Sequence, residues 1–516
     1  MRSIALSTMA FLGLGALAQP GSWDTSFGDN GKVLVPSLGG GNDDQTVTAV
    51  VLPDDRILVA GRSSDGDHYN TVLLRLNPDG SSDLAYGTDG VVQHDLAAGS
   101  EFIRSAELDG QGRLVVGGHL FSDAAENNSD MFVARFLADG SLDPSFNGTG
   151  ILVRDIHSTP DAEEAYEVLV QPDGRIVLCG FSGAATGLTE VVLERYLDNG
   201  DLDPTFGGDG SVLVSIGDAS GEELRSAVLG DAGDIYFCGL ATRTGESDLS
   251  LLLGHLDAAG NIPTDFGNAS GHSWISEEGA DLIARSIALQ PDGNMVVAGV
   301  KRPTGGSQGR IIHQFDPNGL ELTDAFQNSA EGADAWNCLL VQNNGAILGG
   351  GNVADGPDSR NWNVQRWDAE LNGDGTFVTT DYDEDGGEET CFDLAFTNDS
   401  SVLGIGYAEV AGLNHIVLIK YRNDISSAIE ERSTYGTLSV APNPVSERTT
   451  LTLSNGASTV VDLLLSDPAG RTVRRWSQPL GQGGRLDITL DDLAIGTYSL
   501  RVGNAGHYST VKVVKQ

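Results

Sequence analysis

The sequence predicts an all-β protein: a seven-bladed β-propeller of four-stranded repeats about sixty residues long, followed by a small β-sandwich. Three observations predict this fold. A hydrophobic strand, a turn such as Pro-Asp-Gly and a second hydrophobic strand ending in Gly recur seven times. No stretch keeps the periodicity of a helix. An aromatic residue closes each copy, at Phe27, Tyr86, Phe146, Phe206, Phe266, Phe326 and Phe377.

Each copy supplies the four strands of one blade. In the first strand, polar and apolar residues alternate over part of its length, as in residues 285–289 (RSIAL). A tight turn follows, because Gly tolerates positive φ and Pro presets the first φ of the turn. The second strand, such as 295–299 (MVVAG), is almost wholly apolar, as expected for a strand covered on both faces. Third and fourth strands follow, as at 191–196 (VVLERY) and 210–216 (GSVLVSI), and this spacing of turns is typical of all-β folds.

The two ends of the array predict how the ring closes. The array opens part-way through a repeat, with residues 23–28 (WDTSFG) and a fourth-type strand at 31–35 (GKVLV). It ends on a third strand, 415–421 (HIVLIKY), with no fourth strand after it. Pairing 31–35 beside 415–421 leaves no sheet edge open, so we expect the first strand to complete the seventh blade.

A basic residue of the third strand and an Asp eight residues later occur together. Where the basic residue becomes His255 or Gln314, the corresponding Asp is also absent. Loss in pairs favours ion pairs that brace the turn between third and fourth strands, rather than a basic ring that binds an anion. The expected pairs are Arg75–Asp83, Arg135–Asp143, Arg195–Asp203, Arg366–Asp374 and, across the ring closure, Lys420–Asp24.

The repeats resemble a known family. Strings such as 289–299 (LQPDGNMVVAG) and 195–210 (RYLDNGDLDPTFGGDG) are similar to the delta-60 repeats of bacterial secreted proteins. The resemblance covers residues 23–424, and copies five and six depart most from the pattern. It implies a β-propeller-like fold, and no activity or ligand accompanies the repeat as such.

The first residues have the features of an export signal. Arg2 precedes an apolar run, and Ala16 and Ala18 stand where a signal peptidase cleaves. We therefore expect residues 1–18 to be a secretory signal peptide, with the propeller in 19–424. The apolar run is too short for a membrane anchor, and no other segment is long and apolar enough to span a bilayer.

The composition shifts near residue 437. Residues 437–516 contain Asn443-Pro444, an Asp-x-x-Gly-Arg motif, a Leu-x-x-Gly-x-Tyr motif and a Lys-rich end. This order resembles the C-terminal sorting domain of the type IX secretion system of the Bacteroidetes group. The resemblance implies a partner, the secretion machinery, and a secreted or outer-membrane surface location. It also implies that the domain is removed or exchanged for an anchor, and the linker 425–436 is the natural place for processing.

The charge of the chain excludes some partners. It carries 73 acidic and 30 basic residues, and residues 437–516 account for only 6 and 8 of these. So acidic a propeller repels nucleic acid and anionic lipid. It favours solubility, divalent cations or a basic partner, although acidic loops that simply keep an exported protein dispersed are the simpler interpretation.

One loop has the composition of a metal site. Asp381, Asp383 and Asp385 alternate before Gly386, as in the first half of an EF-hand loop. Position twelve is Phe392 rather than Glu, which excludes an EF-hand. The list of candidate ligands for a weak calcium site is Asp381, Asp383, Asp385 and Glu389, with Glu388 as a substitute. The alternative is a solvated acidic loop, and we expect no other cofactor.

The four cysteines do not form a disulfide framework. Cys179 and Cys238 take the place of Ala in the second strand, which predicts buried free thiols. Cys338 and Cys391 lie near the first strands of the sixth and seventh copies. Whether these two pair is left open.

No catalytic residue can be named from the sequence. The nine histidines are scattered, and no nucleophile elbow or phosphate loop is present. First strands offer polar residues to the central channel, where a structural role is the simpler interpretation; they are Arg104, Arg225, Arg285, Glu167 and Asp393. We therefore expect a binding scaffold for an extracellular polymer or protein. The alternative is a hydrolase or lyase acting on a polysaccharide or ester, which would need a cleft of polar groups that differ between copies.

Overall fold

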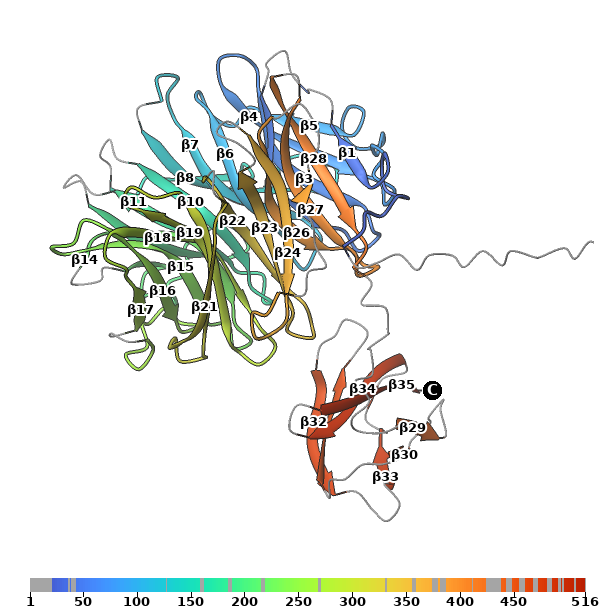
Figure 1. Cartoon of the computed structure of the whole chain (residues 1–516). Coiled ribbons are helices and arrows are strands. Elements are labelled where there is room, and N and C mark those ends of the chain that lie inside the picture. The colour runs from blue at the N-terminus through green and yellow to red at the C-terminus, as the bar shows by residue number, and fades with distance from the viewer. Residues whose placement is uncertain are drawn as a thin grey trace, which may run out of the picture. The chain divides into compact units, whose positions relative to one another are not determined.

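The structure is a computed structural model in which the chain forms two compact units, residues 1–424 and 425–516 (Figure 1). In the first unit it describes residues 21–35, 38, 43–126, 128–157, 162–183, 188–214, 219–267, 271–329, 332–354, 359–373, 379–380, 387–410 and 412–423. In the second it describes residues 438–441, 448–453, 460–466, 472–479, 485–490, 493, 496–504 and 507–515. The expected signal peptide 1–18 and linker 425–436 lie outside these residues.

The first unit is a propeller of seven four-stranded antiparallel sheets (Figure 1). The first three blades are β2 to β5 (Asp44–Val51, Ile57–Ser64, Tyr69–Leu76, Val91–His94), β6 to β9 (Glu101–Leu108, Leu114–Phe121, Ser129–Phe136, Ile151–Arg154) and β10 to β13 (Glu163–Val170, Ile176–Gly183, Thr189–Tyr196, Ser211–Val214). The next three are β14 to β17 (Ala219–Leu229, Ile235–Arg243, Leu249–Leu256, His272–Ile275), β18 to β21 (Ala280–Leu289, Met295–Pro303, Gly309–Phe315, Glu321–Gln327) and β22 to β25 (Ala335–Val341, Ile347–Ala354, Arg360–Trp367, Thr379–Thr380). The seventh is β26 to β28 (Glu389–Phe396, Val402–Val410, Leu413–Tyr421) with β1 (Lys32–Leu34).

The seventh blade joins the two ends of the array. Strand β1 pairs antiparallel with β28, with Lys32 opposite Ile419 and Leu34 opposite Val417. The backbone N–H of Asp24 donates to the carbonyl of Lys420 at 2.7 Å. Because β1 is the outer strand of this sheet, the N-terminal segment closes the ring non-covalently.

The core lies between neighbouring blades. Second strands are covered on both faces, and seven of the eight residues of β7 are buried. One apolar cluster, for example, joins Leu58 and Leu73 of the first blade to Val116 and Phe132 of the second. Each buried side chain of this size contributes about 1.5–3 kcal/mol relative to exposure. The continuous apolar runs of the repeat therefore supply the contacts that hold blade to blade.

The closing aromatic residues plug the gaps between blades. Phe27, Phe146 and Phe206 are at most 1% exposed. Phe326 differs, with 42% exposed, and lies in β21. Its copy has Gln327 after the aromatic residue, whereas four other copies have a Gly there and Phe146 is followed by Asn147, all at positive φ. Strand β21 therefore runs straight through this position instead of turning inward.

The second unit consists of two sheets with one shared apolar core. Strands β29 (Leu438–Ala441), β30 (Arg448–Leu453) and β33 (Arg485–Thr489) form the first sheet. The second sheet has the order β32, β31, β34, β35, whose bounds are Thr472–Pro479, Val460–Ser466, Gly496–Asn504 and His507–Lys515. Leu451 and Ile488 of one sheet belong to the same core cluster as Leu463 and Leu500 of the other. Among the described residues of the chain, no helix is long and apolar enough to cross a membrane.

Candidate ligand site in the central cavity

Every innermost strand of the propeller carries a β-bulge at the same place. The register with the second strand shifts at this place in each of the seven propeller sheets, and β14 has a further shift near its start. A bulge leaves one residue unpaired and re-aims its side chain. The residues at the shifts are Val47, Arg104, Tyr166, Arg225, Arg285, Asn337 and Phe392.

A glycine of the second strand makes room for each bulge. A Cβ on Gly299 would lie 2.0 Å from the carbonyl oxygen of Ile283, two residues before the bulge residue Arg285. The corresponding distances in all seven blades are between 1.8 and 2.4 Å, at Gly61, Gly118, Gly180, Gly239, Gly299, Gly351 and Gly406. The Gly that ends the repeat signature is therefore required by the close approach of a neighbouring carbonyl, which any side chain would block.

The seven bulge residues surround a cavity of about 600 Å³. All seven line it, together with the residue that follows each of them along the strand. Around the ring, blades two to six contribute polar groups, which are Arg104, Tyr166, Arg225, Arg285 and Asn337. Blades one and seven, which are neighbours through the ring closure, contribute Val47 and Phe392. The cavity wall is thus cationic and polar over most of its circumference and apolar over the rest.

The arginines of the wall are held by few acceptors. Arg285 donates from Nη1 to Oδ1 of Asn337 at 2.6 Å. Arg225 lies over the ring of Tyr166, with its guanidinium carbon 4.4 Å from the centroid, and donates to the Tyr166 hydroxyl and to Glu223. Arg104 is 3.7 Å from a carboxylate oxygen of Glu164. Arg104 also lies over the Tyr166 ring, with its guanidinium carbon 5.1 Å from the centroid, so Tyr166 contacts two of the three arginines.

Arg285 is the least compensated of these cations. Among the described residues, no carboxylate lies within 4 Å of its guanidinium group. Burial lowers the pKa of Arg285 to about 10, and the like charges of Arg302, Arg225 and Arg360 act in the same direction. A guanidinium in such a setting is stabilised by an anion that enters the cavity.

The carboxyl groups that line the cavity are hydrogen-bonded to hydroxyl groups of neighbouring blades. Glu167 accepts hydrogen bonds from the hydroxyls of Ser105 and, at 3.2 Å, Ser226. Asp393 accepts from the hydroxyl of Thr48 at 2.8 Å. Burial raises the pKa of Glu167 to about 7 and that of Asp393 to about 6, and the charge of Asp393 adds to the shift of Glu167. These bonds join blades two, three and four, and blades seven and one, below the bulge residues.

The sequence-predicted ion pairs lie as follows. The distances from arginine Nε to carboxylate oxygen are 2.7 Å for Arg75–Asp83, 2.8 Å for Arg135–Asp143 and 2.8 Å for Arg195–Asp203. Asp374, the expected partner of Arg366, lies outside the described residues. Lys420 is 3.6 Å from Asp24 and only 2.8 Å from Asp399, so its shorter contact is within its own blade.

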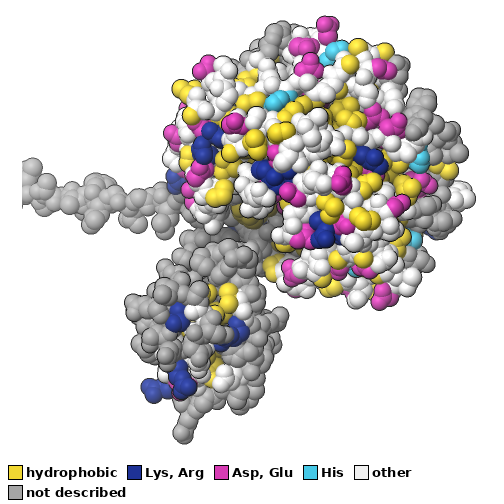
Figure 2. All heavy atoms as spheres, turned by 180° about the vertical axis from the view of Figure 1, so that it is seen from behind, with side chains coloured by type: hydrophobic (Ala, Val, Ile, Leu, Met, Phe, Trp, Pro, Cys, Tyr) yellow, Lys and Arg dark blue, Asp and Glu magenta, His cyan; other side chains and the backbone are white. Residues whose placement is uncertain are grey.

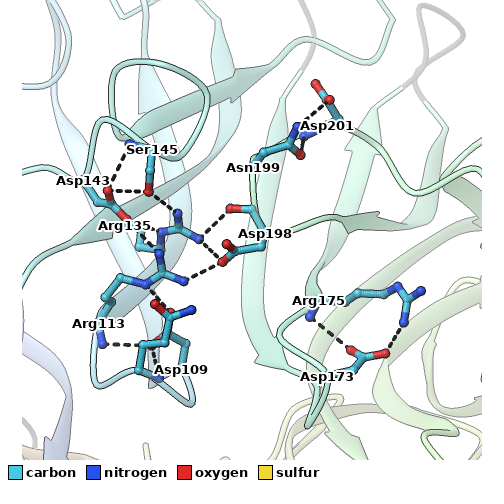
Figure 3. A network of polar contacts seen from close by, with 11 residues as sticks. Asp109, Arg113, Arg135, Asp143, Ser145, Asp173, Arg175, Asp198, Asn199 and Asp201 are labelled. Carbon is cyan, nitrogen blue, oxygen red and sulfur yellow. Dashed lines mark hydrogen bonds and ion pairs between the residues drawn. The ribbon is translucent and has the colours of Figure 1, made fainter.

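Two features of this brace escaped the sequence argument (Figure 3). A second arginine, from the first turn of the blade, shares the carboxylate: Arg113 Nη1 is 3.2 Å from Asp143. The first arginine also reaches the next blade, because Arg135 Nη1 donates to the carbonyl of Asp198 at 2.7 Å. The brace therefore joins neighbouring blades as well as stiffening one turn. The same kind of contact joins Arg56 to Asp83 and Arg175 to Asp203, so an arginine after the first turn recurs in three blades, a signal that the sequence did contain.

The expected calcium site cannot be placed. Asp381, Asp383 and Asp385 lie outside the described residues. Glu389 is 1% exposed, and its carboxylate accepts from the backbone N–H of Trp362 at 3.3 Å. Glu101 accepts from Thr71 N–H in the same way at 2.9 Å, so this position caps the preceding blade in more than one copy. The calcium site stays a prediction.

One other acidic group has the spacing of a metal site. Oxygen atoms of Asp130, Asp155 and Glu163 lie within 4.8 Å of one another. The Glu163 carboxylate, however, already accepts from the backbone N–H of Ile156 and from the Ser182 hydroxyl at 2.9 Å. Glu163 thus joins the second and third blades by hydrogen bonds, while Asp130 accepts from the Ser122 hydroxyl within its own blade.

All four cysteines are free thiols in buried positions. Cys179 and Cys238 occupy second strands, and burial raises both pKa values well above the usual range. Cys338 lines the cavity, and its sulfur lies near that of Cys391 over Gly350. Burial and the second thiol raise the pKa of Cys338, which disfavours its thiolate form.

The outer surface contrasts with the cavity. Figure 2 shows acidic side chains scattered over the visible face of the propeller, with lysine and arginine in a few separate places. The net charge of the chain is −43. A cationic cavity inside an acidic protein concentrates its attraction for anions at one point.

Family comparisons agree with the two units. Residues 52–86, 112–146 and 171–206 match a family model described as a β-propeller domain of unknown function (DUF5122). Residues 439–516 match the secretion system C-terminal sorting domain. No curated protein matches the chain.

Several solved structures are similar. PorZ, a surface component of the type-IX secretion system of Porphyromonas gingivalis, is 12% identical, with 93% of this chain and 61% of PorZ covered and a TM-score of 0.35. The polysaccharide lyase Uly1 is 9% identical, with 73% and 90% covered and a TM-score of 0.48. A sialidase of Trypanosoma rangeli is 10% identical, with 76% and 59% covered and a TM-score of 0.36.

These similarities say nothing of activity or ligand, and the chain spans less than two thirds of the length of PorZ. The family matches are more specific, because they fall on the repeats and on the C-terminal unit separately. The chain therefore carries β-propeller repeats that match this family, followed by a type IX secretion sorting domain, which indicates export to the cell surface or secretion.

Proposed function

We propose that this exported propeller is a binding protein and that its central cavity holds the ligand. The observation that carries the proposal is a contrast between two sets of residues: the second-strand glycines, which form the frame, and the bulge residues, which form the cavity wall. The second-strand glycine is the same in all seven blades, whereas the bulge residue beside it is Val, Tyr, Asn, Phe or, three times, Arg. A frame kept constant around a varied concave surface is what a binding site requires.

The groups that face the cavity favour recognition over catalysis. Guanidinium, amide and hydroxyl groups fix the orientation of a ligand by hydrogen bonds and charge. The carboxyl groups of Glu167 and Asp393 are engaged with Ser105 and Thr48, and so act in the first place as braces of the ring.

A hydrolase or lyase acting on a polysaccharide or ester is the second candidate. The observation that favours it is Glu167, because a carboxyl group with a pKa of about 7 in a cavity is suited to general acid–base catalysis. The variant Glu167→Gln distinguishes the enzyme from the binding protein. An enzyme would lose turnover of its substrate and still bind it, whereas a binding protein would keep its ligand and show no turnover before or after the change.

The test of the binding proposal is a screen of the full chain against extracellular glycans and proteins, with one variant that fills the cavity. Val47→Trp places a large side chain at a half-buried bulge position. Leu84→Trp, at a residue that is 70% exposed, is the matched control. We expect a ligand that binds the wild type and the control and is lost in Val47→Trp. Binding that survives Val47→Trp would place the ligand elsewhere and overturn the proposal.

The export route has its own test. Deleting residues 437–516 removes the sorting unit, which forms a core of its own. We expect the propeller to fold and to stay in the periplasm. Arrival of the truncated protein in the medium would show that export does not depend on this unit.

A further inference from the structure

We propose that the cavity binds an acidic saccharide, with its carboxylate or sulfate group held by Arg285, Arg225 and Arg104. This inference rests on the proposed binding function and names the class of the ligand. The three guanidinium groups line one cavity, and each belongs to a different blade. Guanidinium forks bind carboxylate and sulfate groups through paired hydrogen bonds, which makes arginine the residue suited to such anions.

The charge balance of the wall favours an anionic ligand. Among the described residues, the only hydrogen-bond acceptor of Arg285 is a neutral amide, that of Asn337. The Nε atoms of Arg104 and Arg225 are buried and have no hydrogen-bond partner in the part of the chain that the structure describes. Buried donors without partners are costly, and a ligand that supplies acceptors removes this cost. The wall therefore offers more donors than the protein itself satisfies.

The rest of the wall matches the other surfaces of a sugar. Ser286 accepts from the backbone N–H of Leu339 at 3.0 Å and keeps its own hydroxyl proton as a donor. Asn337 and Tyr166 add an amide and a phenol. Phe392 and Val47, of blades seven and one, form the apolar part of the wall. An acidic sugar presents a charge, several hydroxyls and an apolar ring face, whereas a purely apolar or a neutral polar ligand would use only part of this wall.

A second groove extends the site outward. It has a volume of about 480 Å³, lies between the fourth and fifth blades, and shares Arg225 and Arg285 with the central cavity. Arg302 lines the groove as well, and its Nε donates to the neutral side chain of Gln308 at 2.8 Å. The two spaces thus adjoin at these two arginines. We infer that the ligand is an oligosaccharide that runs from the cavity over Arg285 into the groove.

The acidic exterior limits the length of this ligand. A net charge of −43 repels a long polyanion, including nucleic acid. The ligand is therefore a short acidic oligosaccharide, or the end of a longer chain.

The experiment is calorimetric titration of the full chain with three probes. Trigalacturonate carries three carboxylates, its methyl ester has the same sugar backbone without charge, and a sulfated carrageenan disaccharide replaces carboxylate by sulfate. We expect trigalacturonate or the sulfated probe to bind and the ester to bind at least tenfold more weakly, as for loss of charged hydrogen bonds. Which charged probe binds more tightly identifies the anion. Raising the salt concentration should weaken binding.

Two substitutions assign the binding to this wall. Arg285→Met keeps the length of the side chain and should weaken binding roughly 10- to 100-fold. Its melting temperature should not fall, because the change removes a desolvated charge beside like charges. Arg302→Met should weaken the binding of trigalacturonate and leave the affinity for the disaccharide unchanged. Arg243→Met, outside both spaces, is the control.

The outcomes separate this inference from the binding function. Equal affinity for acid and ester, with loss of both in Val47→Trp, would overturn the acidic ligand and leave the cavity as a binding site. Failure of both charged probes at millimolar concentration, or unchanged affinity in Arg285→Met and Arg104→Met, would likewise overturn it. Tighter binding of a twelve-nucleotide DNA than of either sugar would replace the saccharide by nucleic acid.

Discussion

The strictest consequence of the bulge geometry concerns Gly299. Replacing it by Ala adds a methyl group that would meet the carbonyl oxygen of Ile283 at 2.0 Å and the Cα of Ala284 at 3.0 Å. Both obstacles are backbone, so no rotation of a side chain relieves them. The strands β18 and β19 must separate by about 1 Å, or the bulge must be lost.

The cost follows from this contact. Overpacking in a well-packed region costs about 1–3 kcal/mol, and a backbone obstacle favours the upper half of that range. Unfolding entropy is about 2.1 cal/mol/K per residue, which for a unit of 424 residues is about 0.9 kcal/mol/K. A loss of about 2–3 kcal/mol therefore lowers the melting temperature by about 2–3 °C.

The assay is differential scanning calorimetry of Gly299→Ala beside Gly110→Ala. Gly110 has no atom within 4 Å of the added methyl group and no positive φ, so its replacement should be neutral or stabilise by about 0.4–1 kcal/mol. Displacement of the bulge should also move Arg285 and weaken whatever the cavity binds. A Gly299→Ala protein that melts with the wild type would refute the explanation of the repeat glycine.

Four further predictions test other parts of the structure. Val33→Asp places an unpaired carboxylate in the buried face of the closing strand and should lower the free energy of unfolding by about 3 kcal/mol or more. It should also expose the N-terminal segment to limited proteolysis, and a segment that stays intact would contradict the closure. Asp143→Ala should cost about 1–3 kcal/mol in urea unfolding because it removes the buried carboxylate that Arg135 and Arg113 share, although Asp198 still contacts Arg135, while Asp139→Ala, on the exposed turn, should cost under about 1 kcal/mol. The pKa of Glu167 is raised on folding, so the folded protein binds the proton more tightly and stability should rise as pH falls from about 8 to 5; Glu167→Gln should reduce this rise, and an unchanged slope would contradict it. If the loop 381–389 binds calcium, millimolar calcium should raise the melting temperature and Asp383→Ala should abolish the rise.

The repeat architecture was predictable because its signals are local. Turn chemistry, apolar runs and a fixed spacing lie within each copy and recur seven times. The blade count followed from the ends of the array, and β1 pairs with β28 in the structure. The joint loss of Arg and Asp pointed to the brace because both partners lie eight residues apart on one turn.

The bulges were not predictable, because they depend on two strands at once. In the sequence, nothing distinguishes Arg104, Arg225 and Arg285 from other polar residues of a strand in which polar and apolar residues partly alternate. Their unpaired positions arise from the register with a second strand, where a glycine admits a carbonyl. The contact of Arg135 with the next blade escaped for the same reason, since it depends on how blades dock.

The bulge also explains how one frame can carry different ligands. A side chain in a regular position of the second strand, such as Val297, lies in the contact between blades and has no room to change. A side chain at the bulge faces the cavity, and its backbone is accommodated by the glycine opposite rather than by its own size. Replacement there alters the charge and shape of the wall while the packing between blades is kept. Because seven such positions meet at one place, a few substitutions are enough to turn a cationic wall into a neutral or acidic one. Under the proposed function, the specificity of the cavity is thus uncoupled from the stability of the ring, and we expect the ligand class to follow from the bulge residues rather than from the repeat family.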